Sequence, residues 1–448
     1  MSREETLDVS EYINQRSFNG FNVMVMALSF LVVLIDGFDI AVAGFATPGL
    51  IKAWNVEPSA FGPVLGASLF GMLFGAPLFG LIGDRYGRKT AIVTSYLMFG
   101  IFTLGAAASA SIVQLATLRF VAGIGIGGVL PNIVALNAEF APRRLQATAV
   151  IVSFTGVAFG GALPGPVAAF LVPHYGWQIL FLIGGIIPLL VAAVVTLWLP
   201  ESIRFLALQD RQADVVKLIA RMGPDTGVAP TTRFVVREDK RVPIKRLFSG
   251  ELAVMTPLLW LLFALNLMAY FFLISWMPTL LSSANIPVAQ AALATTVMQI
   301  GGVLGSWGIA WPMDRLGMLP ITVLFVLAIP IVGAIGYVGL QSIAYLMAIV
   351  FLAGFCTLGL QMGLNAVSAI LYPTALRSTG SGACFGIGRV GSILGPLIGG
   401  VLIGMHLPVP TLYMIAAIPF MLGAVVSFVL MQLFATRMQK QAAAEALG

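Results

Sequence analysis

The chain has 448 residues, of which 59% are hydrophobic and only 9% are charged, and its formal net charge is +6. A soluble domain carries about 25% charged residues and roughly half apolar ones, so this composition excludes a water-soluble fold. The two cysteines, Cys356 and Cys384, both fall in apolar runs. A thiol there acts as a small hydrophobic side chain and gives no information on redox compartment.

Twelve apolar runs approach or exceed the length of about 20 residues that a helix needs to cross a bilayer. The sequence therefore predicts an all-α membrane protein with twelve transmembrane helices. The first run contains acidic residues and no small-residue cleavage site, so it predicts a retained span and not a signal peptide. The expected spans are 22–43, 58–82, 90–110, 112–138, 146–171, 177–199, 253–280, 289–311, 319–338, 343–371, 379–403 and 409–434.

Lysine and arginine residues set the expected orientation, because basic residues near span ends mark the cytoplasmic side. If both termini are cytoplasmic, 21 of the 24 basic residues lie in inner segments and only Lys52 lies in an outer loop. The other two, Arg119 and Arg389, lie inside spans. This distribution predicts cytoplasmic termini, and it explains the positive charge without a nucleic-acid partner.

The longest polar segment divides the predicted spans into six plus six. We expect an N-terminal tail and six-helix bundle at 1–199, a cytoplasmic linker at 200–252, and a C-terminal six-helix bundle and tail at 253–448. Within the linker, apolar residues between Phe205 and Met222 recur on one helical face. That pattern fits either a helix lying on the inner leaflet or a solvated connector.

The two halves are related by a shift of about 230 residues, which brings Asp84-Arg85-Tyr86-Gly87 onto Asp314-Arg315-Leu316-Gly317. Parallel repeats of this kind, with a site near the bilayer midplane at their interface, are one plan of secondary transporters. The sequence therefore predicts a duplicated six-span unit.

The loop after the second span reads Gly80-Leu-Ile-Gly83-Asp84-Arg85-Tyr86-Gly87-Arg88-Lys89 and resembles the signature loop of the major facilitator superfamily. An acid such as Asp84 could stabilise a helix N-terminus and so bias two conformations. The alternative is that the basic residues only anchor topology. The second copy has Ala310 in place of the first glycine and lacks the trailing basic pair, which weakens its assignment to gating. The expected gating residues are Gly83, Asp84, Arg85, Gly87, Arg88, Asp314 and Arg315.

Two aspartates, Asp36 and Asp39, stand three residues apart on one face of the first span. At about 1.5 Å per residue they lie roughly 4.5 and 9 Å from the span midpoint, and Arg119 in the fourth span lies about 7 Å out on the same side. Charges inside a bilayer are costly and nearly always pair or face water. We expect Asp36 or Asp39 to pair with Arg119, either as a coupling site or as a purely structural ion pair.

The fourth span also resembles the superfamily pattern, with Arg119 followed by Gly123, Gly125, Gly127 and Gly128, which permit close helix approach. Together with Asp36-Gly37-Phe38-Asp39 in the first span and Gly386-Ile-Gly388-Arg389 in the eleventh, these motifs make the chain resemble the aromatic acid/proton symporter family within the major facilitator superfamily.

The resemblance implies proton-coupled uptake of an aromatic acid such as 4-hydroxybenzoate, benzoate or protocatechuate across the bacterial inner membrane by alternating access. It assigns proton coupling to Asp36, Asp39, Arg119 and Glu139, although a helix-end glutamate on the surface explains Glu139 equally well. Arg389 is the expected ligand of the substrate carboxylate, and Arg119 could exchange roles with it. Depth in the spans makes further residues candidates for the substrate site, and for each of them ordinary packing or an interhelical hydrogen bond is the alternative. These residues are Phe154, Tyr270, Phe271, Gln299, Gln361 and Asn365.

Other functions remain open at this point. A proton-coupled carrier of a sugar, a drug or an aliphatic acid would share the fold, and an arginine in the C-terminal half favours an anionic cargo only modestly. A membrane-embedded enzyme or a transporter-like sensor is remote, because no predicted span contains histidine and no cluster of catalytic or metal-binding residues is evident. We expect no cofactor and no metal, with membrane lipids, protons and the substrate as partners of a monomer.

Overall fold

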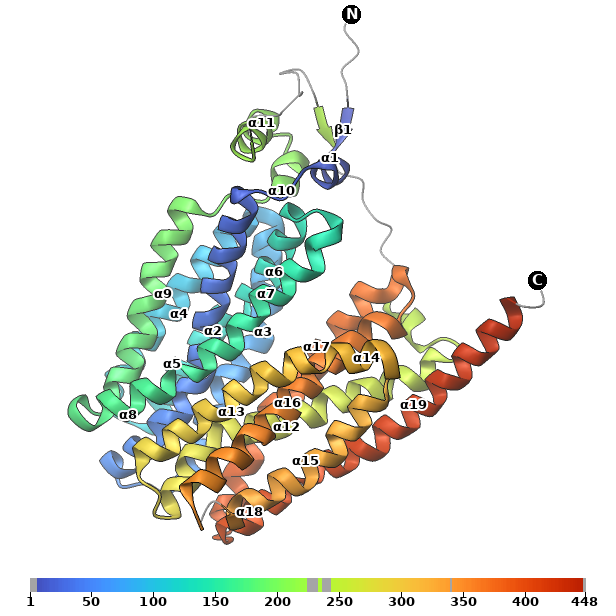
Figure 1. The fold of residues 1–448 in the computed structure, drawn as a ribbon. Coiled ribbons are helices and arrows are strands. Elements are labelled where there is room, and N and C mark those ends of the chain that lie inside the picture. The colour runs from blue at the N-terminus through green and yellow to red at the C-terminus, as the bar shows by residue number, and fades with distance from the viewer. Residues whose placement is uncertain (1–5, 224–232, 236–242, 339–340, 446–448) are drawn as a thin grey trace, which may run out of the picture. The chain divides into compact units, whose positions relative to one another are not determined.

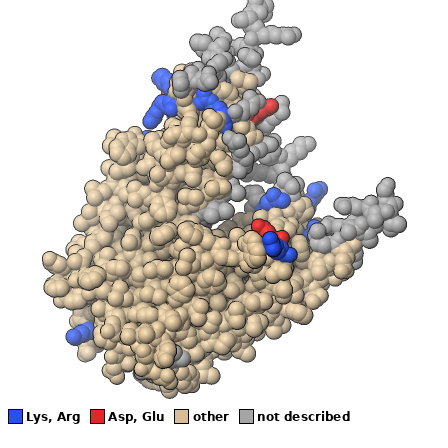
Figure 2. Space-filling model, viewed as in Figure 1, with Lys and Arg blue, Asp and Glu red and all other residues tan. Residues whose placement is uncertain are grey.

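The computed structural model describes residues 6–223, 233–235, 243–338 and 341–445. Among these residues, twelve helices are long and apolar enough to cross a membrane, and each predicted span overlaps one of them. The all-α membrane fold is therefore confirmed. On the face shown in Figure 2, charged side chains gather at a few places, and the broad area between them carries none.

The chain forms two compact units. Unit 1 contains Met1–Ile40, Phe70–Gly161 and Gln178–Lys240, and unit 2 contains Ala41–Leu69, Ala162–Trp177 and Arg241–Gly448. Unit 2 thus includes helix ends from the first half of the sequence. The domain boundaries expected at 199/200 and 252/253 stay a prediction.

Unit 1 contains the first part of α2, which contacts α4, α5 and α7 (Figure 1). Its core includes Val32, Ile92 and Phe99, all of which are buried. Ser111 caps α5 by accepting a hydrogen bond from the Gln114 amide at 3.2 Å. The elements wholly or partly in this unit are β1 (Thr6–Asp8), α1 (Val9–Gln15), α2 (Gly20–Trp54), α3 (Gly62–Tyr86), α4 (Arg88–Ala107), α5 (Ile112–Gly127), α6 (Val129–Phe140), α7 (Arg143–Ala162), α9 (Gln178–Trp198), α10 (Ile203–Leu208), α11 (Gln212–Arg221) and β2 (Arg233–Val235).

The glycine run of α5 allows the close packing that the sequence predicted. A Cβ at Gly125 would contact the backbone of Ser95 and Phe99 on α4, and one at Gly127 would contact the backbone of Met72 on α3. Small residues let helix backbones approach in this way. The contact fixes α5, and therefore Arg119, against two neighbouring helices.

The N-terminal segment and the linker pack together at one end of unit 1, where β1 pairs in parallel with β2 (Figure 1). The Tyr12 ring packs edge-on against Phe234, with ring centroids 5.7 Å apart. The apolar face of α11 is buried within the protein at Val215, Leu218 and Ile219. The segment from Phe205 to Met222 thus forms two helices, α10 and α11, and not one, and the apolar face of α11 is covered by protein, whereas Leu208 at the end of α10 is exposed.

Unit 2 contains the remaining helices, in which α12 packs along α17 and α13 packs along α16. These pairs approach closely at glycines: a Cβ at Gly391 would meet the backbone of Ala264, and one at Gly354 would meet the backbone of Met298. The elements wholly in this unit are η1 (Pro58–Phe61), α8 (Pro164–Tyr175), η2 (Ile244–Phe248), α12 (Leu252–Ser283), α13 (Val288–Gly308), α14 (Ala310–Leu316), α15 (Leu319–Val338), α16 (Ile343–Leu371), α17 (Thr374–Gly404), α18 (Val409–Ala416) and α19 (Ile418–Glu445).

Candidate functional site

The structure joins one of the two aspartates of α2 to Arg119 of α5. Arg119 Nη1 donates to Asp39 Oδ1 at 2.5 Å, and Nη2 donates to Oδ2 at 2.8 Å and to the Asp39 carbonyl oxygen at 3.1 Å. Both side chains are buried, with exposed fractions of 1% for Arg119 and 0% for Asp39. A two-pronged guanidinium–carboxylate contact is among the strongest hydrogen-bonded pairs in proteins.

Phe181 of α9 completes the surroundings of the guanidinium. The Arg119 Cζ atom lies 5.8 Å from the centroid of its ring. A cation near an aromatic face is attracted by the ring quadrupole, and the attraction is larger when water is excluded. Arg119 is therefore held in place from two directions.

Asp36 occupies a different environment one helical turn away. Its Oδ1 atom lies 3.5 Å from the hydroxyl oxygen of Tyr96, a buried residue of α4. The same hydroxyl is within hydrogen-bond distance of the Val32 carbonyl oxygen. Tyr96 was not among the residues predicted from the sequence, although a tyrosine inside a span next to a serine is a polar feature that could have suggested it.

Glycines hold α2 close to α7 at the depth of Asp36. A Cβ at Gly37 would collide with the backbone of Val157, and a Cβ at Gly160 would collide with the backbone of Leu34. Gly37 thus separates the two aspartates because the facing helix leaves no room for a side chain there. The backbone that carries Asp36 is fixed by this contact.

Glu139 lies apart from the aspartates, at the end of α6. It is 20 residues beyond Arg119, which corresponds to about 30 Å of helical rise. The Ser202 hydroxyl donates to Glu139 Oε2 and also caps α10 by accepting from the Phe205 amide at 3.0 Å. In this structure Glu139 binds the start of the linker, and its expected part in proton coupling remains a prediction.

The first signature loop is fastened to the same linker start. Glu201 Oε1 accepts from the Lys89 amide at 3.0 Å, so Glu201 is the carboxylate at the N-terminus of α4. Asp84 forms an ion pair with Arg88 at 2.5 Å, and Arg88 also donates to Asn132 at 3.2 Å. Gly87 adopts a φ of 101°, a backbone conformation that residues with a Cβ atom rarely adopt.

The second loop shares one backbone feature with the first. Gly317 also has a positive φ, of 60°, at the position equivalent to Gly87. Asp314 and Arg315 are exposed, and the Arg315 guanidinium lies 4.4 Å from the centroid of the Trp311 ring. Arg85 of the first loop likewise lies over the Tyr86 ring, at 5.5 Å.

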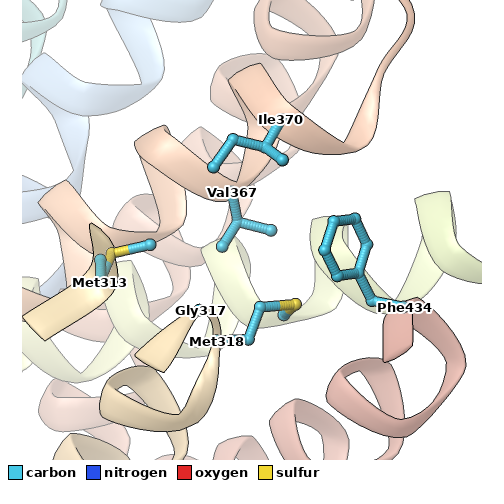
Figure 3. Close-up of a pocket in the computed structure, with 6 residues that line it drawn as sticks. All are labelled: Met313, Gly317, Met318, Val367, Ile370 and Phe434. Carbon is cyan, nitrogen blue, oxygen red and sulfur yellow. The ribbon is translucent and has the colours of Figure 1, made fainter. Parts of the chain in front are cut away.

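A small pocket in unit 2 lies beside this second loop, as Figure 3 shows. Every side chain that lines it is apolar, so it offers neither a cation nor a hydrogen-bond donor to a carboxylate. It is not the predicted substrate site. Its lining residues are Met313, Gly317, Met318, Val367, Ile370 and Phe434.

Four of the predicted substrate residues lie in two hydrogen-bonded pairs of unit 2. The Tyr270 hydroxyl donates to Gln299 Oε1 at 3.1 Å, between α12 and α13. On α16, Gln361 Nε2 donates to Asn365 Oδ1 at 3.2 Å. Phe271 is buried and packs edge-on against Tyr270, with ring centroids 5.2 Å apart. The side chain of Phe154 lies outside the described part of the structure.

Asn266 of α12 links to the second pair and was not among the predicted residues. Its Nδ2 atom donates to Gln361 Oε1 at 3.1 Å and to the Thr357 carbonyl oxygen at 3.2 Å. It precedes Tyr270 by four residues and so shares its helical face. That spacing was visible in the sequence and could have identified Asn266.

Arg389 lies in α17 of unit 2 and is half-buried. The neighbouring glycines place it along α12: Gly388 packs against Phe263 and Leu267, and Gly391 packs against Ala264. Arg389 is therefore level with the part of α12 that contains Asn266. In the part of the chain that the structure describes, no group of three or more His, Cys, Asp or Glu side chains could hold a metal ion.

Comparison with known proteins identifies the family. The family model of the Major Facilitator Superfamily matches residues 29–383. The 4-hydroxybenzoate transporter PcaK of Pseudomonas putida is 37% identical over 90% of each chain. The gallate transporter of the same organism is 36% identical over 92% of each chain. These relatives confirm the resemblance to transporters of aromatic acids.

Solved structures agree with the fold. The xylose transporter XylE from Escherichia coli, in a partially occluded inward-open conformation, superposes with a TM-score of 0.69 at 17% identity, covering 92% of this chain and 98% of that one. At that identity the likeness concerns the fold alone. The chain therefore belongs to the Major Facilitator Superfamily and is a transporter, not an enzyme.

Proposed function

We propose that this protein is a proton-coupled symporter that carries an aromatic carboxylic acid, such as a hydroxybenzoate or benzoate, into a bacterium across the inner membrane. Relatives that cover most of the chain carry the names 4-hydroxybenzoate transporter and gallate transporter, which supports the substrate class. The basic residues of the loops support cytoplasmic termini. Transport proceeds by alternating access of a site near the middle of the membrane.

The observation that carries the coupling proposal is the unequal environment of Asp36 and Asp39. A proton on Asp39 would disrupt two hydrogen bonds from Arg119 and leave the buried guanidinium without its counter-ion. Breaking a buried ion pair in this way costs about 3–5 kcal/mol. A proton on Asp36 leaves the pair intact. We therefore assign the transported proton to Asp36 and an orienting role to Asp39 and Arg119.

Tyr96 supports this assignment because its hydroxyl lies beside Asp36. The hydroxyl also donates to the Val32 carbonyl oxygen, and while its proton points there, the hydroxyl oxygen can accept a hydrogen bond from a protonated Asp36. Asp36 thus has a partner when it carries the proton.

The charge of the cargo supplies the reason for coupling. An aromatic carboxylate is an anion at neutral pH, and an interior-negative membrane opposes its entry by about 2.3 kcal/mol per charge per 100 mV. One proton for each carboxylate cancels that charge. Asp36, Asp39, Arg119 and Arg389 are together close to neutral when ionised, so substrate and proton together keep the loaded carrier close to neutral.

Arg389 is the proposed ligand of the substrate carboxylate. A guanidinium can donate to both carboxylate oxygens at once. Arg119 already uses Nη1 and Nη2 on Asp39, which disfavours the exchanged roles that the sequence left open. Tyr270 and Phe271, which pack against each other on α12, supply aromatic surface in the same unit.

The experiment is uptake of labelled 4-hydroxybenzoate by the purified protein in liposomes, with and without an inward proton gradient. The proposal predicts accumulation only with the gradient, abolished by a protonophore and competed by other benzoates. Competition by a sugar, a cationic drug or an aliphatic acid, with none by any aromatic carboxylate, would assign a different cargo. Equal accumulation without a proton gradient would contradict the coupling.

A further inference from the structure

Two buried amide side chains in unit 2 each keep one polar end without a hydrogen-bond partner among the residues that the structure describes. These ends are Oδ1 of Asn266 and Nε2 of Gln299. Both residues are at most 1% exposed. Leaving a buried polar atom unpaired is costly, and most buried polar atoms in proteins are paired. Two such atoms on facing helices therefore need an explanation.

The other end of each amide is held firmly by protein. Asn266 donates through Nδ2 to the Thr357 carbonyl oxygen and to Gln361, and Gln299 accepts at Oε1 from the Tyr270 hydroxyl. Turning the Gln299 amide over would pair the other atom with the tyrosine and still leave one end without a partner. The two side chains are thus fixed in place, and each presents a spare hydrogen-bonding group.

These groups belong to the part of unit 2 that contains Arg389. Arg389 is level with the stretch of α12 around Asn266, as the packing of Gly388 and Gly391 shows. Tyr270, which positions Gln299, lies four residues further along α12, and this corresponds to about 6 Å of rise. Asn266 and the Tyr270–Gln299 pair thus lie within about the length of one benzoate molecule of each other along α12.

We propose that Asn266 and Gln299 bind the ring hydroxyl of the substrate and so select hydroxylated aromatic carboxylates over unsubstituted ones. This inference rests on the proposed function and assigns its specificity to two named residues. A phenolic hydroxyl both donates and accepts a hydrogen bond. It therefore suits an acceptor at Asn266 Oδ1 and a donor at Gln299 Nε2, whereas a bare ring leaves both atoms unpaired.

The first test needs no substitution. Binding of benzoate, 3- and 4-methylbenzoate, and 3- and 4-hydroxybenzoate to the purified wild-type protein would be measured by competition with labelled 4-hydroxybenzoate. The inference predicts that at least one hydroxybenzoate binds about 5-fold or more tightly than the methylbenzoate of the same shape, as one net hydrogen bond supplies. Equal binding of both series would overturn it.

The second test uses Gln299→Met and Asn266→Leu, which remove the spare groups while keeping similar volume. Each change is expected to lower the preference for the hydroxylated ligand about 5-fold and to leave benzoate binding within about 2-fold. Gln290→Met is the matched control, because Gln290 lies on the same helix α13 but is exposed. It is expected to leave the preference unchanged.

The ratio of the affinities for hydroxylated and unsubstituted ligands distinguishes recognition of the hydroxyl from a structural role of the two amides. A purely structural role of the amides would weaken hydroxylated and bare rings equally, and that result would overturn the inference while the proposed function stands. If wild-type protein binds and transports no aromatic carboxylate of either series, the proposed function itself fails. A selective loss for hydroxylated rings in either amide variant supports the inference.

Discussion

Arg119 binds the Asp39 carboxylate through two hydrogen bonds inside the protein, and Asp36, one turn earlier on the same helix, contacts Tyr96 instead. This difference divides two acids that look equivalent in the sequence into a fixed counter-ion and a candidate proton carrier.

The Asp39–Arg119 pair should matter for stability. Asp39→Asn leaves the buried guanidinium without a counter-ion, so we expect a loss of about 3–5 kcal/mol in the free energy of unfolding. The double variant Asp39→Asn/Arg119→Gln removes both charges and should recover part of the loss. Thermal unfolding in detergent measures both effects. A single variant as stable as wild type would show that the pair is not buried as described.

Gly37 should be intolerant of any side chain. In Gly37→Ala the new Cβ meets the backbone of Val157, so α2 and α7 must separate. We expect the free energy of unfolding to fall by about 1–3 kcal/mol and transport to be reduced. Gly382→Ala is the control, because a Cβ there meets no heavy atom within 4 Å. Equal melting temperatures for the two variants would argue against the close approach of α2 and α7.

The N-terminal segment should protect the linker from proteolysis. Tyr12 packs against Phe234, and the centroid of its ring lies 5.1 Å from the Arg16 Cζ atom. Tyr12→Ala therefore removes aromatic contacts that add about 1 kcal/mol of stability to the contribution of the buried surface. We expect trypsin to cleave α11, at Lys217 or Arg221, roughly 5-fold faster. Tyr175→Ala, at an exposed position, should not change the rate. Unchanged cleavage in Tyr12→Ala would mean that the segment does not stabilise the linker.

Much of the fold followed from local properties of the sequence. The twelve spans are long apolar runs, and the glycines of α5 lie where its helix meets α3 and α4. Depth arithmetic also placed Arg119 near the two aspartates. These features depend on helix geometry and on the cost of charge in lipid, both of which can be estimated without knowing which helices are neighbours.

Which segments and side chains pair with each other could not be predicted in the same way. Arg119 lies at a depth between Asp36 and Asp39, so only the rotation and spacing of α5 select Asp39. The pairing of β1 with β2 joins segments more than two hundred residues apart, and neither segment carries a local signal for it. The apolar face of α11 was visible, but the packing of this helix against α10 and β2 was not.

The most direct test of the account compares proton-driven accumulation in wild type, Asp36→Asn and the control Glu57→Gln, in which an exposed acid outside the spans is changed. Labelled 4-hydroxybenzoate uptake into liposomes would be followed with an inward proton gradient, and substrate exchange would be followed without one. We predict that Asp36→Asn still exchanges substrate but no longer accumulates it, whereas Glu57→Gln behaves as wild type. Gradient-driven accumulation by Asp36→Asn at the wild-type level would contradict the assignment of the proton to Asp36.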